Sequence, residues 1–138
     1  MLAAAESRGL SQTLATASLE ELSALADAAR YARRTPLARR VLTSQRERFP
    51  GSPAAREAAF FLGRLAENGG GLEWYDRYLA ESPSGPYASQ ALGRKMMWIY
   101  EQSGAAAARS IALDYIARYP KGPYASAALK IERETRAR

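Results

Sequence analysis

Phe49-Pro50-Gly51-Ser52-Pro53-Ala54-Ala55 is one of three closely similar stretches in this chain of 138 residues. The other two are Ser82-Pro83-Ser84-Gly85-Pro86-Tyr87-Ala88 and Tyr119-Pro120-Lys121-Gly122-Pro123-Tyr124-Ala125. All three share the pattern Pro-x-(Ser/Gly)-Pro-x-Ala, and the first proline recurs after 33 and then 37 residues. A recurrence of this length is typical of stacked repeats, in which each unit buries its apolar face only against a neighbour. The spacing therefore predicts an all-α stack of helix pairs that acts as an interaction protein.

Capping and breaking residues between these stretches indicate seven helices in antiparallel pairs. Ser18 and Glu21 form a predicted capping box, and apolar residues recur every three or four positions after it. Thr35 and Ser52 are expected to cap the second and third helices, with Pro36 and Pro53 at their first positions. Gly104 is expected to break the helix that Pro86 starts. The expected helices span about 19–34, 35–48, 53–68, 72–81, 86–102, 105–119 and 123–136.

These helices group into repeat units of about 18–50, 51–83 and 84–120, followed by a final capping helix over 123–136. Residues 1–17 precede the first unit and are expected to form a leader or a short N-terminal helix. An open stack of repeats exposes an apolar end face unless a further segment covers it. The N-terminal end is therefore the predicted surface for a homodimer.

Composition excludes several functional classes. The chain has no cysteine and no histidine, so it has no Cys nucleophile, no Ser-His dyad, no thiolate or imidazole zinc site and no disulfide. No stretch reaches the ~18 consecutive apolar residues of a membrane span. The carboxylates are scattered, and Gly69-Gly70-Gly71 lacks the Lys-Ser/Thr of a phosphate-binding loop. We therefore expect a protein that is not an enzyme and needs no metal or cofactor.

The formal net charge is +6, from 20 basic and 14 acidic residues. This charge is compatible with binding to nucleic acid or to an anionic surface. Basic and acidic residues are interspersed along the predicted helices, which favours a solvated surface over a nucleic-acid patch. Binding through the basic exterior is therefore the alternative function, and it predicts an affinity that falls steeply with salt.

The chain resembles the tetratricopeptide repeat over roughly residues 18–138. Leu62-Gly63 and Leu92-Gly93 match the family's Leu-Gly pair, and Phe49-Pro50 and Tyr119-Pro120 match its terminal aromatic-Pro. The Pro-x-(Ser/Gly)-Pro-Tyr-Ala junction is similar to bacterial envelope repeats, such as the outer-membrane assembly lipoprotein and the Tol-associated periplasmic protein, and to the repeat tails of FecR-like anti-sigma regulators. The resemblance implies a right-handed α-solenoid that binds a protein partner, in a bacterial envelope or regulatory complex. A periplasmic or envelope-associated location is favoured if the chain is a domain of a longer exported protein.

In this family the first helices of successive units line a concave groove, where partners lie as extended peptides or helices. Carrying the family's groove positions over by register gives the predicted partner-binding residues Glu57, Phe60, Arg64, Tyr87, Gln90, Arg94, Trp98 and Tyr124. The same register adds Asp27, Arg30, Tyr31, Glu67, Met97 and Ile131.

Two interpretations of these residues stay open. Arg64 and Arg94 fall at matching groove positions and could clamp a carboxylate, since the arginine fork suits bidentate recognition. They could equally be surface arginines paired with nearby glutamates. Tyr87 and Tyr124 could anchor a partner or pack against the prolines that precede them. For Trp98 a place in the core is favoured over a ligand contact.

Overall fold

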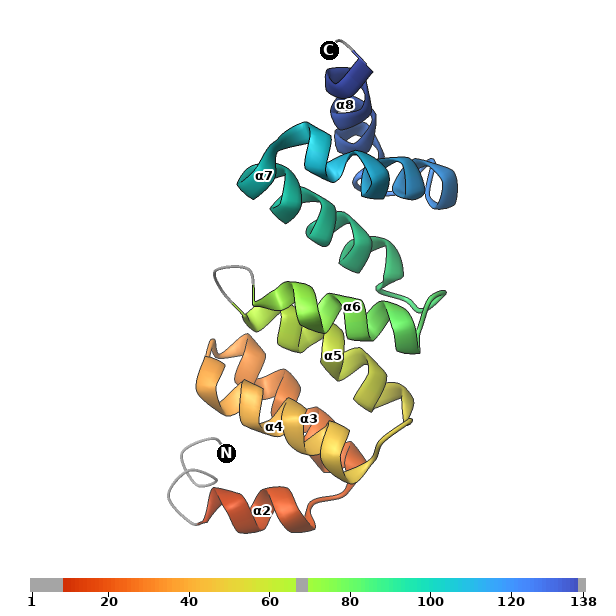
Figure 1. The fold of residues 1–138 in the computed structure, drawn as a ribbon. Helices are drawn as coiled ribbons and strands as arrows, with labels where there is room; N and C mark the ends of the chain where they lie inside the picture. Colours follow the sequence, from red (N-terminus) through yellow and green to blue (C-terminus); the bar gives the residue numbers. More distant parts are fainter. Residues whose placement is uncertain (1–8, 67–69, 137–138) are drawn as a thin grey trace. The chain divides into compact units, whose positions relative to one another are not determined.

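The computed structural model describes residues 9–66 and 70–136, and these residues form seven α-helices (Figure 1). Helices that follow one another in sequence pack together: α3 on α4, α4 on α5 and α7 on α8. Gly104 has φ 87° and ψ 177° and divides α7 into two helical segments, as its position predicted. The all-α class and the sequential pairing of helices are therefore confirmed. The helices are α2 (Leu10–Thr16), α3 (Leu19–Tyr31), α4 (Thr35–Arg48), α5 (Pro53–Leu65), α6 (Gly71–Glu81), α7 (Ala88–Arg118) and α8 (Ala125–Arg136).

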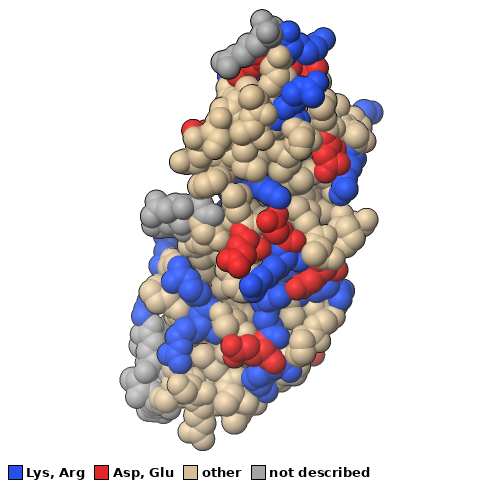
Figure 2. All heavy atoms as spheres, viewed as in Figure 1, with Lys and Arg blue, Asp and Glu red and all other residues tan. Residues whose placement is uncertain are grey.

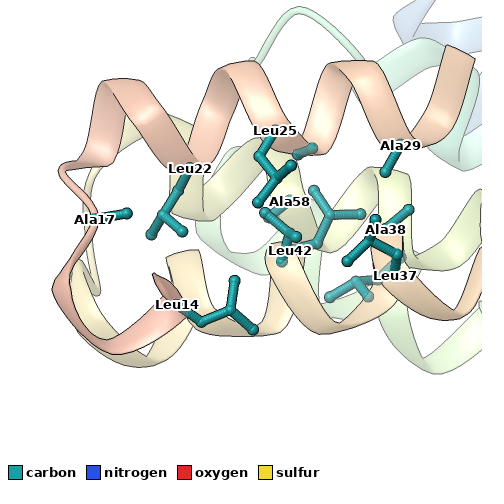
Figure 3. Packing of buried hydrophobic residues seen from close by; sticks show 12 residues of the cluster. Leu14, Ala17, Leu22, Leu25, Ala29, Leu37, Ala38, Leu42 and Ala58 are labelled. Atoms are coloured by element: carbon teal, nitrogen blue, oxygen red, sulfur yellow. The ribbon is translucent and has the colours of Figure 1, made fainter. Parts of the chain in front are cut away.

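The chain divides into two compact units, Met1–Trp74 and Tyr75–Arg138, each with its own core. In the first unit, leucines of α3 and α4 point toward one another between small residues such as Ala29 and Ala38 (Figure 3). The alanines keep the two backbones close, and the leucines fill the space between them. No helix in the described residues is long and apolar enough to cross a lipid bilayer.

The short helix α2 belongs to the first unit and packs on α4. Its Leu14 and the following Ala17 are buried in the core. The Arg48 guanidinium donates hydrogen bonds to the carbonyl oxygens of both residues, at 2.8 Å for Leu14, and Arg40 donates to the Ser11 hydroxyl at 3.2 Å. The sequence predicted either a leader or a short N-terminal helix over residues 1–17, and residues 10–16 form a short helix.

Two of the predicted N-caps are confirmed and one is wrong. Ser18 and Glu21 form both bonds of the capping box at 3.0 Å, and the Ser52 side chain accepts the Ala55 amide at 3.1 Å. Thr35, however, is the first residue of α4, and Arg34 occupies the cap position without a side-chain bond. The cause is the tight exit from α3, in which the Arg34 amide bonds the Ala29 carbonyl at 2.8 Å. The next helix starts directly after this turn.

The second unit contains two copies of one turn, each closed by a buried tyrosine. Tyr78 and Tyr115 are both fully buried, and their hydroxyls accept the backbone amides of Tyr87 (2.9 Å) and Tyr124 (3.0 Å). Burial raises the pKa of Tyr115. The proline and the tyrosine that follow each glycine lie in the turn, so α7 and α8 begin two residues later than Pro86 and Pro123 predicted.

Gly85 and Gly122 lie directly against these tyrosine hydroxyls, and a Cβ at either position would overlap the hydroxyl oxygen. Both positions therefore require glycine, because the tyrosine hydroxyl leaves no room for a side chain. At the first junction, Gln45 takes the place of the buried tyrosine, five residues before the first proline. It is also buried, but it donates to the Ser23 hydroxyl at 2.9 Å.

A hydrogen bond fastens the end of α8 to α7. The Tyr100 hydroxyl lies 2.9 Å and 3.0 Å from the two carboxylate oxygens of Glu134 and donates to that carboxylate. This bond raises the pKa of Tyr100. Close by, the exposed Arg109 donates to the Thr135 hydroxyl at 3.2 Å.

Candidate functional site: a groove between α3 and α5

A groove of about 530 Å³ lies between α3 and α5, the helices that begin successive helix pairs. It is lined by residues from the last turns of both helices. We call it the α3–α5 groove, and its residues are Asp27, Arg30 and Tyr31 from α3 and Phe61, Arg64 and Leu65 from α5.

The lining residues have the same spacing on both helices. Positions i, i+3 and i+4 of a helix lie on one face, so 27, 30 and 31 face the groove together, as do 61, 64 and 65. The other faces are occupied by the core, where Leu25, Ala26 and Ala29 of α3 are buried. Arg30 and Arg64 also lie in the last turns of their helices, where a positive charge is favourable beside the helix dipole.

One cation of the groove is held in place. The Arg30 guanidinium lies over the Phe61 ring, 3.6 Å from its centroid, and forms an ion pair with Asp27 at 3.0 Å. Both contacts fix the side chain, and the carboxylate offsets its charge. Arg30 therefore links α3 to α5 and forms part of the wall.

Tyr31 and Arg64 are exposed groove residues, as is Asp27, whose carboxylate is paired with Arg30. Tyr31 is 93% exposed, far more than the other large hydrophobic residues of the described chain. Arg64 is exposed and forms no hydrogen bond or ion pair with the described residues. The groove thus offers an aromatic ring and a positive charge in one place.

Several predicted groove residues are instead part of the core. Phe60 is completely buried, so its prediction as a partner contact is wrong, and its neighbour Phe61 lines the groove. Ile131 is buried in the core of the second unit, and Met97 packs against that core. Sequence register did not identify Phe61 or Leu65, although both share the helical face of Arg64.

The two tyrosines at the junctions are structural. The Tyr87 amide donates to Tyr78, and the two rings lie 6.3 Å apart. The Tyr124 ring covers Gly93 so closely that a Cβ there would overlap it. Both side chains are half-buried against Tyr78, Tyr115 and Gly93, whereas the sequence had offered a partner or the preceding prolines as their contacts.

The remaining predicted residues lie on helices outside the α3–α5 groove. Glu57 on α5 and Gln90 and Trp98 on α7 are half-buried. Arg94 is also half-buried, and its Nε atom is buried without a hydrogen-bond partner in the described chain. Glu67 falls outside the described residues.

The structure does not bring Arg64 and Arg94 together in one unit. Arg64 belongs to the first unit and Arg94 to the second. The glycines used for the register also differ in position, since Gly63 is the eleventh residue of α5 and Gly93 is the sixth of α7. The carboxylate clamp therefore stays a prediction, and Arg64 enters the α3–α5 groove independently of it.

The described residues contain no group of three or more His, Cys, Asp or Glu side chains that could hold a metal ion. Comparison of the chain with protein-family models, curated proteins and solved structures found no match. The candidate site is therefore defined by its own geometry, and the tetratricopeptide resemblance rests on the residues that carry it.

Proposed function

We propose that this chain is a non-catalytic scaffold that binds a peptide or a partner helix in the α3–α5 groove. The observation that carries the proposal is the exposure of Tyr31 beside Arg64, in a groove between the helices that begin successive pairs. Tyrosine and arginine are the residue types enriched at interface hot spots, because each combines contact area with hydrogen bonding.

The groove chemistry indicates what the partner presents. Arg64 is an exposed cation without an internal partner, so it favours a carboxylate. Tyr31 and Leu65 offer apolar surface for an apolar side chain. We therefore expect a segment that carries an acidic and an apolar residue close together.

The same proposal includes the repeat architecture. Sequential helix pairs and proline-bounded turns support a right-handed tetratricopeptide-like solenoid. The similarity of the Pro-x-(Ser/Gly)-Pro-Tyr-Ala junctions to those of bacterial envelope repeats and anti-sigma regulators supports a role in a bacterial envelope or regulatory complex.

Selection from a random peptide library displayed on phage tests the proposal. The native chain is the bait, and the Tyr31→Ala/Arg64→Glu variant serves for counter-selection. Enriched peptides are synthesised, and their affinities are measured by fluorescence anisotropy. We expect peptides with an acidic and an apolar residue, and we expect each single variant to weaken them by about tenfold, a typical hot-spot loss.

Arg133→Glu is the matched control, because it reverses an exposed charge on α8 in the other unit. It should leave the peptide affinity unchanged. Peptides that bind the Tyr31→Ala/Arg64→Glu variant as tightly as the native chain would refute the groove as the binding site.

A further inference from the structure

The net charge of the protein is concentrated in one short segment. Residues 30–48 contain seven arginines and one acidic residue, Glu47, a net charge of +6. The rest of the chain contains thirteen basic and thirteen acidic residues and is neutral in sum. This segment covers the end of α3, the turn after it and all of α4, where blue side chains gather at the left of the first unit in Figure 2.

The seven arginines have different roles. Arg30, Arg46 and Arg48 are half-buried, and they stack on aromatic rings or bond backbone carbonyls. By contrast, Arg33 and Arg39 are exposed, and their side chains form no hydrogen bond or ion pair with the described residues. The fold does not use these two positive charges internally.

Arg33 occupies a position that favours glycine. Its φ of 57° is the one left-handed value among the non-glycine residues of the described chain. Such a conformation costs an L-residue about 1 kcal/mol or more, and helices that end in this way usually have glycine at this position. Arg33 therefore places an exposed positive charge in this turn at a cost in backbone strain.

Two exposed arginines of the same segment line a second groove, of about 550 Å³, between α2 and α4. Arg39 and Arg40 share this α2–α4 groove with three hydroxyl side chains, from Ser11, Thr43 and Ser44. Arg40 is held by Ser11 at 3.2 Å. Glu47 is the acidic side chain in the lining, and the large apolar one, Leu14, is buried.

We propose that Arg33, Arg39 and Arg40 form an interface for the phosphate backbone of a nucleic acid, with the α2–α4 groove as its centre. Arginine and hydroxyl side chains are the groups that contact phosphate oxygens in such complexes. A membrane surface fits less well, because the strength of binding to it depends on buried apolar area as well as on charge, and the exposed large hydrophobic residues of the described chain, Tyr31, Leu113 and Leu129, do not line this groove. A peptide fits less well, because Leu14, the large apolar side chain of this groove, is buried.

Fluorescence anisotropy with labelled oligonucleotides tests this interface. Oligo-uridylate, oligo-thymidylate and a duplex, each about 20 nucleotides long, are titrated at about 50 and 200 mM salt. The main variant is Arg33→Gly/Arg39→Gln, which removes two charges that the fold does not use. Arg133→Gln on α8 is the matched control, since it removes one exposed charge from the other unit.

We expect the native chain to bind at low salt and to lose affinity as salt rises. For a single strand, each phosphate contact adds about 0.7 to the slope of log K against log salt. The main variant should therefore show a slope shallower by about 1.4 and an affinity at least about tenfold weaker at 50 mM salt. Arg133→Gln should stay within about twofold of the native chain. Tighter binding of either the single strand or the duplex would support the interface and identify which of the two nucleic-acid forms it binds.

Four results would overturn the proposal. One is no binding of the native chain to any oligonucleotide at 50 mM salt. A second is an equal loss in Arg133→Gln, which would show that only net charge matters. Competition by poly-glutamate as effective as that by oligo-uridylate at equal charge would exclude a phosphate-specific site. Binding to anionic vesicles without binding to oligonucleotides would assign the surface to a membrane.

Discussion

The turn closed by Tyr115 gives a sharp test of why these junctions need glycine. Tyr115→Phe removes the hydroxyl that accepts the Tyr124 amide at 3.0 Å. Gly122→Ala places a methyl group against the same hydroxyl. If the hydroxyl both bonds the amide and fills the space beside the glycine, the two substitutions must affect each other's cost.

The magnitudes follow from these contacts. Loss of the hydroxyl leaves a half-buried amide without its partner and should cost about 1–2 kcal/mol. The added methyl overpacks the turn and should cost about 1–3 kcal/mol. Without the hydroxyl, the nearest atoms to the new Cβ are Tyr119 Cβ at 3.0 Å and Tyr115 Cζ at 3.1 Å. The double variant should therefore be more stable than additivity predicts, by about 1 kcal/mol.

The matching pair in the other turn is an internal control. In Gly85→Ala the new Cβ would also lie 2.8 Å from Ser82 Cβ. Tyr78→Phe should therefore reduce the destabilisation by Gly85→Ala less than Tyr115→Phe reduces that by Gly122→Ala. Urea unfolding of all six variants, followed by circular dichroism, gives the free energies of unfolding. Additivity within about 0.3 kcal/mol for Tyr115 and Gly122 would refute the reasoning.

Three further outcomes follow from individual contacts. Arg33→Gly should raise the free energy of unfolding by about 1 kcal/mol, because glycine adopts φ 57° without strain. A lower free energy of unfolding, measured by urea titration, would contradict this. The pKa of Tyr100 is raised in the folded chain from the usual 10.0, so the stabilising bond to Glu134 is present at neutral pH and is lost as pH rises through that pKa. Stability should therefore fall more steeply above about pH 10 in the native chain than in Tyr100→Phe, and parallel pH profiles would count against the bond. Arg48→Met should release the end of α2 because it removes two hydrogen bonds to carbonyl oxygens, and hydrogen exchange should then accelerate in α2 while the amides of α8 stay unchanged.

The sequence by itself determined where most helices begin and end. The capping box at Ser18, the cap at Ser52 and the break at Gly104 depend on residues a few positions away, so local chemistry was sufficient. Thr35 failed as a cap for a reason that was not visible locally, since the turn after α3 ends in left-handed Arg33 and leads straight into α4.

Tertiary structure alone decided which side chains are available for binding. Neighbouring helix positions differ by about 100° in direction, so a shift of one residue separates the fully buried Phe60 from Phe61, which lines the groove. Helix packing likewise places the half-buried Arg48 on the carbonyl oxygens of Leu14 and Ala17, 34 and 31 residues away. The sequence determines the charge and the helical period, whereas the packing of the helices selects which groups remain exposed.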